Sequence, residues 1–401
     1  MDYASTLQWM YARLPMYQRL GAAALNPDLT RITALADYLG NPQQGFKSVH
    51  IAGTNGKGSS AHMTAAVLQT AGYKVGLYTS PHLKHFSERI RIDGKPIPSD
   101  FIVAFVAAHK SFLEANSCSF FEMTVAMAFA YFAAQEVDVA VIEVGLGGRL
   151  DATNIIQPEG CLITNISLDH QQFLGSTLTE IAKEKAGIIK PQTPVIISEY
   201  QAEIHTVFEE VAIQKQAPIY QAPATSFKTD LTGDYQQQNA SGVVALLGQL
   251  PSFAVDKTHM QKGLMHVRTL TGLRGRWELL GNNPTTIADV AHNKAGLERV
   301  MAQLEKQQYT QLHIVFGMVN DKDANSIVNL LPREATYYVC AASVPRAMPV
   351  AQLAKIFRAV GLVHSSNSSV SAAYAAARAA AAPDDFIFIG GSLFVVAEVL
   401  P

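Results

Sequence analysis

The sequence predicts an α/β protein of two domains, in which a P-loop domain with a mostly parallel sheet precedes a smaller, Rossmann-like α/β domain. The chain has 401 residues, 48% of them hydrophobic and 16% charged, and single hydrophobic cores usually stop growing near about 250 to 300 residues. Short β-branched runs alternate with helical patterns, which is typical of parallel β-α-β units. A glycine-rich turn between one such run and a helix indicates a phosphate-binding loop.

The strand-like runs form two series, and each predicts one α/β domain. The first series covers residues 47–52, 74–79, 137–144, 161–166 and 194–198. The second covers residues 285–290, 312–316, 337–341 and 386–389, with helical stretches such as 294–307 and 371–382 between them.

Breaker and basic residues gather between the two series, in segment 270–284. Glycines, a proline and arginines in such a mixture favour a connection over a regular element. We therefore predict a first domain over residues 1–272, a hinge over 273–284 and a C-terminal domain over 285–401.

Composition argues against several classes of protein. The formal net charge of -2 provides no field that would attract nucleic acid, and no segment combines dense Lys and Arg with aromatic residues. The cysteines, Cys118, Cys161 and Cys340, are too few and too far apart for a disulfide framework. The sequence shows no secretory leader pattern and no uninterrupted apolar run of about 18 residues. We expect a cytoplasmic protein that acts on small molecules as a monomer, with no nucleic-acid or membrane partner.

The glycine-rich turn reads His-Ile-Ala-Gly-Thr-Asn-Gly-Lys-Gly-Ser-Ser over residues 50–60. Gly53, Gly56 and Gly58 would let backbone amides approach phosphate oxygens. A helix expected to begin near Ala61 would add the positive end of its dipole.

Two side chains of this turn suit a nucleoside triphosphate. Lys57 would neutralise the outer phosphates, and Ser59 would offer its hydroxyl to a metal. The usual pattern G-x-x-x-x-G-K-[ST] is matched imperfectly, because the first glycine comes two residues late and Gly58 separates Lys57 from Ser59. A purely structural turn is the alternative, but three glycines and a lysine in this context favour phosphate binding.

Three candidate metal ligands follow predicted strands. Glu143 ends an apolar strand, and Ser80 and His170 follow two others. Parallel α/β sheets bind ligands at the carboxyl ends of their strands, where a carboxylate can hold Mg²⁺. Taken singly, a histidine is more often a structural residue and a serine more often a turn residue.

Lys185 is expected to point into the protein. In a helix over residues 179–187 it lies four residues after Ile181 and shares its face, whereas Lys183 points about 200° away. A buried ammonium group is costly, so such a lysine either pairs with a carboxylate or loses its proton.

Short motifs accompany the loop along nearly the whole chain. They occupy residues 53–59, 78–83, 88–90, 121–124, 143–154, 168–170, 184–188, 233–239, 276, 289–293 and 390–393. In order and sequence they resemble the folylpolyglutamate synthase and dihydrofolate synthase family, the folate branch of the Mur ligase superfamily.

The resemblance implies an enzyme that binds ATP and two Mg²⁺ ions. It assigns Ser80 and Glu143 to one ion and His170 to the other, and it implies that Lys185 carries a carbamate formed with carbon dioxide. The implied catalytic residues are Lys57, Glu143, His170 and Lys185. The implied ATP contacts are Thr54, Asn55, Gly56, Lys57, Gly58, Ser59, Asn239, Arg276 and Asp289.

The resemblance also implies the substrates, which are dihydropteroate or a reduced folate together with L-glutamate. The implied substrate contacts are Ser119, Phe121, Asp151, Ala152, His292 and Ser392. Phe121 would stack on the pterin end, although a plain core position is the alternative. Arg276, in the predicted hinge, would reach the triphosphate when the domains close.

The implied reaction is amide formation through an acyl phosphate. ATP would phosphorylate the carboxylate of the acceptor, and the amino group of L-glutamate would then displace phosphate. Two departures accompany the resemblance: segment 218–233 is shorter than its counterpart in typical members, and Lys294 stands where they have proline. The alternatives are a related ligase that acts on cell-wall precursors and a non-catalytic nucleotide switch.

Overall fold

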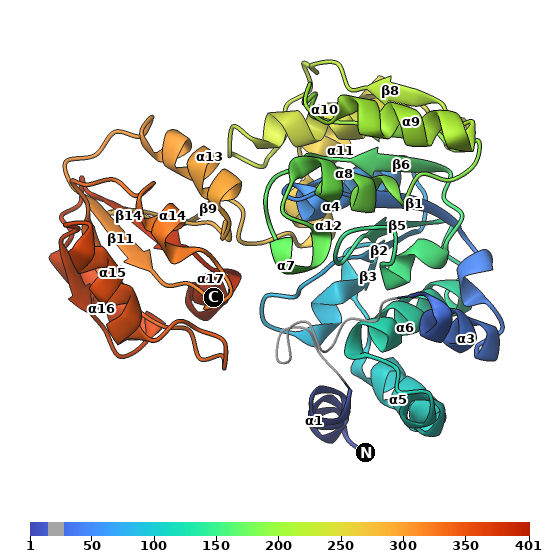
Figure 1. Cartoon of the computed structure of the whole chain (residues 1–401), viewed down its shortest axis with the longest axis horizontal. Coiled ribbons are helices and arrows are strands. Elements are labelled where there is room, and N and C mark those ends of the chain that lie inside the picture. Colours follow the sequence, from blue (N-terminus) through green and yellow to red (C-terminus); the bar gives the residue numbers. More distant parts are fainter. Residues whose placement is uncertain (15–27) are drawn as a thin grey trace. The chain divides into compact units, whose positions relative to one another are not determined.

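The computed structural model describes residues 1–14 and 28–401 (Figure 1). They form two compact units. The first unit comprises Met1–Asp230 and Gln236–Leu273, and the second comprises Leu231–Tyr235 and Arg274–Pro401.

The first unit is built on an eight-stranded sheet in the order β4-β3-β2-β5-β1-β6-β7-β8. Its strands are β1 Lys47–Ala52, β2 Val75–Tyr78, β3 Ile90–Ile92, β4 Lys95–Pro96, β5 Val139–Glu143, β6 Gly160–Ile163, β7 Val195–Ile197 and β8 Ile219–Gln221. Neighbouring strands pair in parallel along β2, β5, β1, β6, β7 and β8. At the other edge, β3 pairs antiparallel with both β2 and β4. The central strands are buried along their length, as parallel strands covered on both faces must be.

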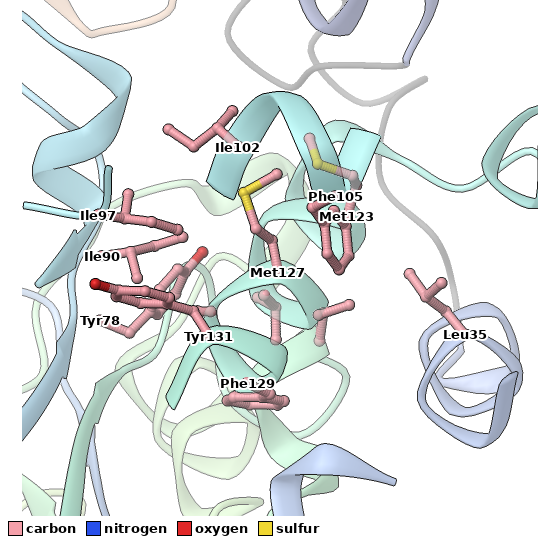
Figure 2. Close-up of a cluster of buried hydrophobic side chains, with 14 of the residues drawn as sticks. Leu35, Tyr78, Ile90, Ile97, Ile102, Phe105, Met123, Met127, Phe129 and Tyr131 are labelled. Atoms are coloured by element: carbon pink, nitrogen blue, oxygen red, sulfur yellow. The ribbon is translucent and has the colours of Figure 1, made fainter. Parts of the chain in front are cut away.

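Helices cover this sheet. They are α1 Tyr3–Arg13, α3 Thr30–Tyr38, α4 Lys57–Thr70, α5 Ser99–Ala115, α6 Phe120–Ala134, α7 Gln171–Leu174, α8 Leu178–Ala186, α9 His205–Lys215, α10 Gln236–Leu247, α11 Lys257–Leu264 and α12 Val267–Thr271, with 3-10 turns η2 Pro42–Gln44, η3 Phe86–Arg89 and η4 Ala152–Ile155. Helix α4 packs against α10, α11 and α12. Figure 2 shows part of the core around α5 and α6, where Met123, Met127 and Phe129 of α6 belong to the same hydrophobic cluster as Tyr78 and Ile90 of the sheet.

The second unit has a six-stranded sheet in the order β13-β12-β11-β14-β10-β9. Its strands are β9 Glu278–Asn282, β10 Thr285–Ala288, β11 Leu312–Phe316, β12 Thr336–Val339, β13 His364–Ser366 and β14 Phe386–Gly390. Only β9 runs antiparallel among the pairings of this sheet in the described residues. The helices are α13 Lys294–Leu304, α14 Ala324–Val328, α15 Val350–Ala359, α16 Val370–Ala380 and α17 Leu393–Val399.

The predicted fold class is confirmed, since both units are α/β with mostly parallel sheets. The structure differs from the sequence analysis at the hinge. Residues 278–282 form β9, because the tight turn at Asn283 and Pro284 folds them back onto β10. Segment 231–235 also belongs to the second unit, although the first unit precedes and follows it in the chain.

The cysteines lie in the cores. Cys118, Cys161 and Cys340 are buried free thiols, and burial raises the pKa of Cys161 to about 12. In the part of the chain that the structure describes, no helix combines the length and the apolar character needed to span a membrane.

Candidate functional site

The phosphate loop connects β1 to α4. Helix α4 begins at Lys57, four residues earlier than the sequence analysis expected, and Gly56 caps it with a φ of +85°. Gly56 therefore adopts a left-handed conformation that other residues rarely reach. Lys57 Nζ donates to the carbonyl oxygens of Gly53 at 3.0 Å and Thr54 at 3.1 Å, so the lysine folds over the loop.

The segment that follows β6 holds the loop from the side. Thr54 N donates to Asn165 O at 2.8 Å, and Asn55 N donates to Asn165 Oδ1 at 2.9 Å. Thr164 Oγ1 donates to Asn55 O at 2.6 Å. A side chain on Gly53 would overlap Thr164, so glycine is required for this close approach.

Helix α10 contacts the loop through two amide side chains. Asn239, predicted to bind ATP, lies against Gly56, where an added Cβ would meet its side chain. Asn239 donates a hydrogen bond to Gln236, and Gln236 donates one to Ser59, which is buried in the first turn of α4.

Ser80 and Glu143 are brought together, as the assignment of one metal ion to both residues requires. Ser80 N donates to Glu143 Oε2 at 3.0 Å, and Glu143 is only 4% exposed. They follow β2 and end β5, which pair in parallel. The Glu143 carboxylate and the hydroxyl that Ser80 carries are oxygen donors of the kind that Mg²⁺ prefers next to nucleotide phosphates, so these residue types fit the ion.

His170 follows β6 and lies beside Asp169. It adopts a left-handed conformation with φ 51°, and its Nε2 lies 3.8 Å from Asp169 Oδ2. Within residues 1–14 and 28–401, no group of three or more His, Cys, Asp or Glu side chains has a metal-binding arrangement. The serine oxygen and the nucleotide phosphates would have to complete any metal site here.

Lys185 points inward and Lys183 is exposed, as the helical spacing predicted. Lys185 Nζ donates to Gly53 O at 2.8 Å. Burial and then the charge of Lys57 lower the pKa of Lys185 well below its usual value, while Asp169 acts in the opposite direction. The lysine therefore contacts the phosphate loop itself.

The residues predicted to bind the pterin end gather near the start of α6. Phe121 is partly buried and its ring lies 6.2 Å from the ring of Tyr78. A side chain on Gly145 would overlap Phe121. Ser119 caps α6, since its hydroxyl oxygen accepts from Glu122 N.

Asp151 is a buried carboxylate in the same region, followed by the buried Ala152. It accepts from Leu146 N at 2.8 Å and from Thr153 N at 3.0 Å. Thr153 Oγ1 donates to it as well, at 2.5 Å. Burial raises the pKa of Asp151, and these hydrogen bonds oppose the rise. Its carboxylate is thus held in one orientation.

In the second unit, Asp289 follows β10 and is 2% exposed. It accepts from Tyr235 OH at 2.5 Å, Trp277 N at 2.8 Å and Ala291 N at 2.8 Å. Burial raises the pKa of Asp289, while Tyr235 and the charge of Arg276 lower it. Arg276, predicted to bind ATP, therefore lies within electrostatic reach of Asp289.

His292 and Ser392, predicted to bind glutamate, follow β10 and β14. His292 Nδ1 lies 3.0 Å from Val290 O. Ser392 caps α17, with its hydroxyl oxygen accepting from Phe394 N. Helix α13 begins at Lys294, the residue that stands where typical members have proline, and Asn293 caps it.

Several residues that hold predicted site residues, in one unit or the other, were not predicted from the sequence. Asn165, Gln236 and Tyr235 each hold a predicted site residue through a hydrogen bond. Gln236 and Tyr235 lie inside the matched motif 233–239, and the helical spacing of Gln236 and Asn239 was the available signal.

Residues 51–250 match the family described as the Mur ligase middle domain, and residues 275–393 match the Mur ligase glutamate ligase domain. A probable bifunctional folylpolyglutamate synthase/dihydropteroate synthase from Haloferax volcanii is 36% identical over 93% of this chain and 48% of its own length. The chain thus spans about half the length of that relative. A folylpolyglutamate synthase from Lacticaseibacillus casei is 33% identical, with 88% of each chain covered.

Solved structures give the same result. E. coli FolC in complex with DHPP and ADP has a TM-score of 0.89 and 29% identity, over 100% of this chain and 97% of that chain. A bifunctional folylpolyglutamate synthase/dihydrofolate synthase with Mn, AMPPNP and L-glutamate bound has a TM-score of 0.85 and 27% identity, over 100% and 97%. The chain carries both Mur ligase domains and belongs to the folylpolyglutamate synthase/dihydrofolate synthase family.

Proposed function

We propose that this protein is an ATP-dependent ligase that forms an amide between L-glutamate and dihydropteroate, a reduced folate, or both. One observation carries the proposal. The phosphate loop, Glu143, Ser80 and the segment after β6 all lie at the carboxyl ends of four neighbouring parallel strands, β2, β5, β1 and β6. Ligands of open α/β sheets bind at that edge.

The loop residues suit a triphosphate. Thr54, Asn55, Gly56, Lys57, Gly58 and Ser59 would contact ATP together with Asn239. Lys57 Nζ donates to the carbonyl oxygens of Gly53 and Thr54, so its ammonium group lies against the loop, which supports a contact with phosphate oxygens bound there. Neutralising the phosphates and aligning the reactants are the main protein contributions in phosphoryl transfer.

Ser80 and Glu143 would hold one Mg²⁺ ion, and His170 would hold a second. Such ions neutralise charge on the phosphates and clamp attacking and leaving oxygens. The relatives' structures contain Mn with AMPPNP, which supports a divalent ion beside the nucleotide.

The reaction balances in two steps. A carboxylate oxygen of the acceptor attacks the γ-phosphorus of ATP, and ADP leaves. The amino group of L-glutamate then attacks the acyl carbon, loses a proton, and expels phosphate to give the amide. Water must be kept out, because it would hydrolyse the acyl phosphate.

The acceptor and glutamate contacts are proposals drawn from the family motifs. The pterin end would meet Ser119, Phe121, Asp151 and Ala152. We assign nucleotide contacts to Arg276 and Asp289 and glutamate contacts to His292 and Ser392. The first domain, 1–272, would bind ATP, and the domain after the hinge would bind glutamate. The buried free thiols suit a reducing compartment, and we place the protein in the cytoplasm as a monomer.

Lys185 would act as a carbamate. Burial and the charge of Lys57 both favour its neutral amine, and a neutral amine adds to carbon dioxide with loss of a proton. Mass analysis of gently handled protein should show this adduct. A Lys185→Ala variant should lose activity and regain part of it with a short-chain carboxylic acid, and full activity of that variant without the acid would remove the proposal.

A product assay tests the whole proposal. The protein is incubated with ATP, Mg²⁺ and L-glutamate, and with dihydropteroate or tetrahydrofolate as the acceptor. We expect ADP and a glutamylated product that both require glutamate and the acceptor. ADP release that ignores both substrates would favour a nucleotide switch, and product formation only with cell-wall precursors would favour the related ligase.

A further inference from the structure

Gln236 and Asn239 lie one turn apart at the start of α10, and both reach the phosphate loop. Asn239 Nδ2 donates to Gln236 Oε1 at 2.8 Å, and Gln236 Nε2 donates to Ser59 Oγ at 3.1 Å. Positions i and i+3 share one face of a helix. The two amides thus form a chain of hydrogen bonds that ends on the third residue of α4.

The direction of this chain follows from its donors and acceptors. Because Gln236 accepts through Oε1, its Nε2 faces Ser59, and an amide nitrogen can only donate. Ser59 Oγ therefore receives a hydrogen bond from the protein. The hydroxyl proton of Ser59 and its second lone pair must then point away from Gln236.

Burial makes this arrangement rigid. The exposed fractions are 0% for Gln236, 7% for Asn239 and 2% for Ser59. Removing a hydrogen-bond partner costs more free energy for a buried polar group than for a surface group, because water does not take the partner's place. Asn239 is further fixed by its contact with Gly56, so the chain is tied to the loop at both ends.

We propose that Gln236 is a positioning residue for the nucleotide phosphates, which it serves by orienting the Ser59 hydroxyl. The inference rests on the proposed ATP-dependent function. Without Gln236, the hydroxyl could rotate and bond back to the helix backbone, as serine side chains commonly do. The phosphates and their metal ion would then meet a misdirected group.

The next two glutamines of α10 provide matched controls. Gln237 Nε2 donates to Thr225 O at 2.9 Å and to Phe227 O at 3.0 Å. Gln238 donates to Ser198 O. Gln237 therefore makes amide hydrogen bonds of the same kind from the same helical turn, but to other partners.

Calorimetric titration of Mg-ADP into the full chain tests the proposal. Gln236→Met should weaken binding about tenfold, or about 1.4 kcal/mol, whereas Gln237→Met should leave it within about twofold. The thermal unfolding midpoints of the two variants should be close, because each loses buried amide hydrogen bonds. On a Ser59→Ala background, Gln236→Met should produce no further weakening, because it acts through Ser59.

Two results would overturn the inference. One is equal weakening by Gln236→Met and Gln237→Met, which would indicate a general effect on α10. The other is full additivity of Gln236→Met and Ser59→Ala. If the unchanged protein itself failed to bind Mg-ADP, the proposed function would fall first and the inference with it.

Discussion

Lys185 and Lys57 donate hydrogen bonds to the same acceptor, the carbonyl oxygen of Gly53, at 2.8 and 3.0 Å. Two lysines, one from α8 and one from the first turn of α4, thus converge on one backbone atom of the phosphate loop. Burial of Lys185, and then the charge of Lys57, lower the pKa of Lys185 and favour its neutral form.

This convergence predicts how stability depends on pH. The pKa of Lys185 is lowered in the folded protein, while the unfolded chain keeps a value of about 10.4. Between the two values the unfolded chain binds more protons, so folding becomes more favourable as pH rises. The cost of burying Lys185 is complete below the folded pKa and disappears as pH approaches the unfolded one.

Lys185→Met should therefore stabilise the protein at pH 7 and lose that advantage as pH rises toward about 10. Thermal unfolding of both proteins in buffers free of carbon dioxide measures the difference. A difference that stays constant over this range would show that Lys185 is not the group responsible.

Gly56→Ala should damage nucleotide binding beyond its effect on the backbone. Both Gly56 and Gly72 have positive φ, of +85° and +90°, but a Cβ on Gly56 would meet Asn239 whereas one on Gly72 would meet nothing within 4 Å. The left-handed backbone should make each substitution cost about 1 to 2 kcal/mol of stability, and Gly56→Ala should cost more because its Cβ also overlaps Asn239. Only Gly56→Ala should weaken Mg-ADP binding, by at least about tenfold, and equal binding by the two variants would contradict this.

Phe121→Leu tests whether Phe121 stacks on the acceptor or only packs in the hydrophobic core. Phe121 and Phe112 are partly buried rings that pack against the same hydrophobic cluster, so Phe112→Leu is the control. If Phe121 stacks on the acceptor, its loss should raise the KM for that acceptor about fivefold, from roughly 1 kcal/mol of aromatic contact, with the KM for ATP unchanged. A fall in the unfolding midpoint with both KM values unchanged would identify Phe121 as a core residue only.

Tyr235→Phe should destabilise the second unit by about 1.5 to 3 kcal/mol, because it removes a hydrogen bond to the buried Asp289 carboxylate. It should also raise the pKa of Asp289 further, since Tyr235 lowers that pKa. Tyr309→Phe is the control, because no hydrogen bond of the Tyr309 hydroxyl is found in the described residues. Denaturant unfolding followed by fluorescence measures the free energy of unfolding of both variants. Equal losses would show that the Tyr235 hydrogen bond adds nothing to stability.

The fold was predictable where strands are apolar on both faces. The runs at 47–52 and 312–316 coincide with β1 and β11 because buried parallel strands are continuous and β-branched. The edge strands β9 and β13 were missed, since exposed edges carry polar residues and glycine and resemble loops.

The positions of some candidate site residues were predictable from strand ends and helix faces. The strand end at Glu143 and the apolar helix face at Lys185 both predicted correctly where these side chains lie. Gln236 was not found, because a glutamine in a run of glutamines is typical of a solvated helix face. Only the packing of α10 on the loop distinguishes it from Gln237.

Activation of a carboxylate by phosphorylation from ATP is the step on which the proposed function depends. An acceptor whose reactive carboxylate carries ¹⁸O tests this most directly, with inorganic phosphate analysed by mass spectrometry after turnover with glutamate. The account predicts that one ¹⁸O atom passes from the carboxylate to each phosphate released. Phosphate without the label, formed alongside glutamylated product, would contradict it.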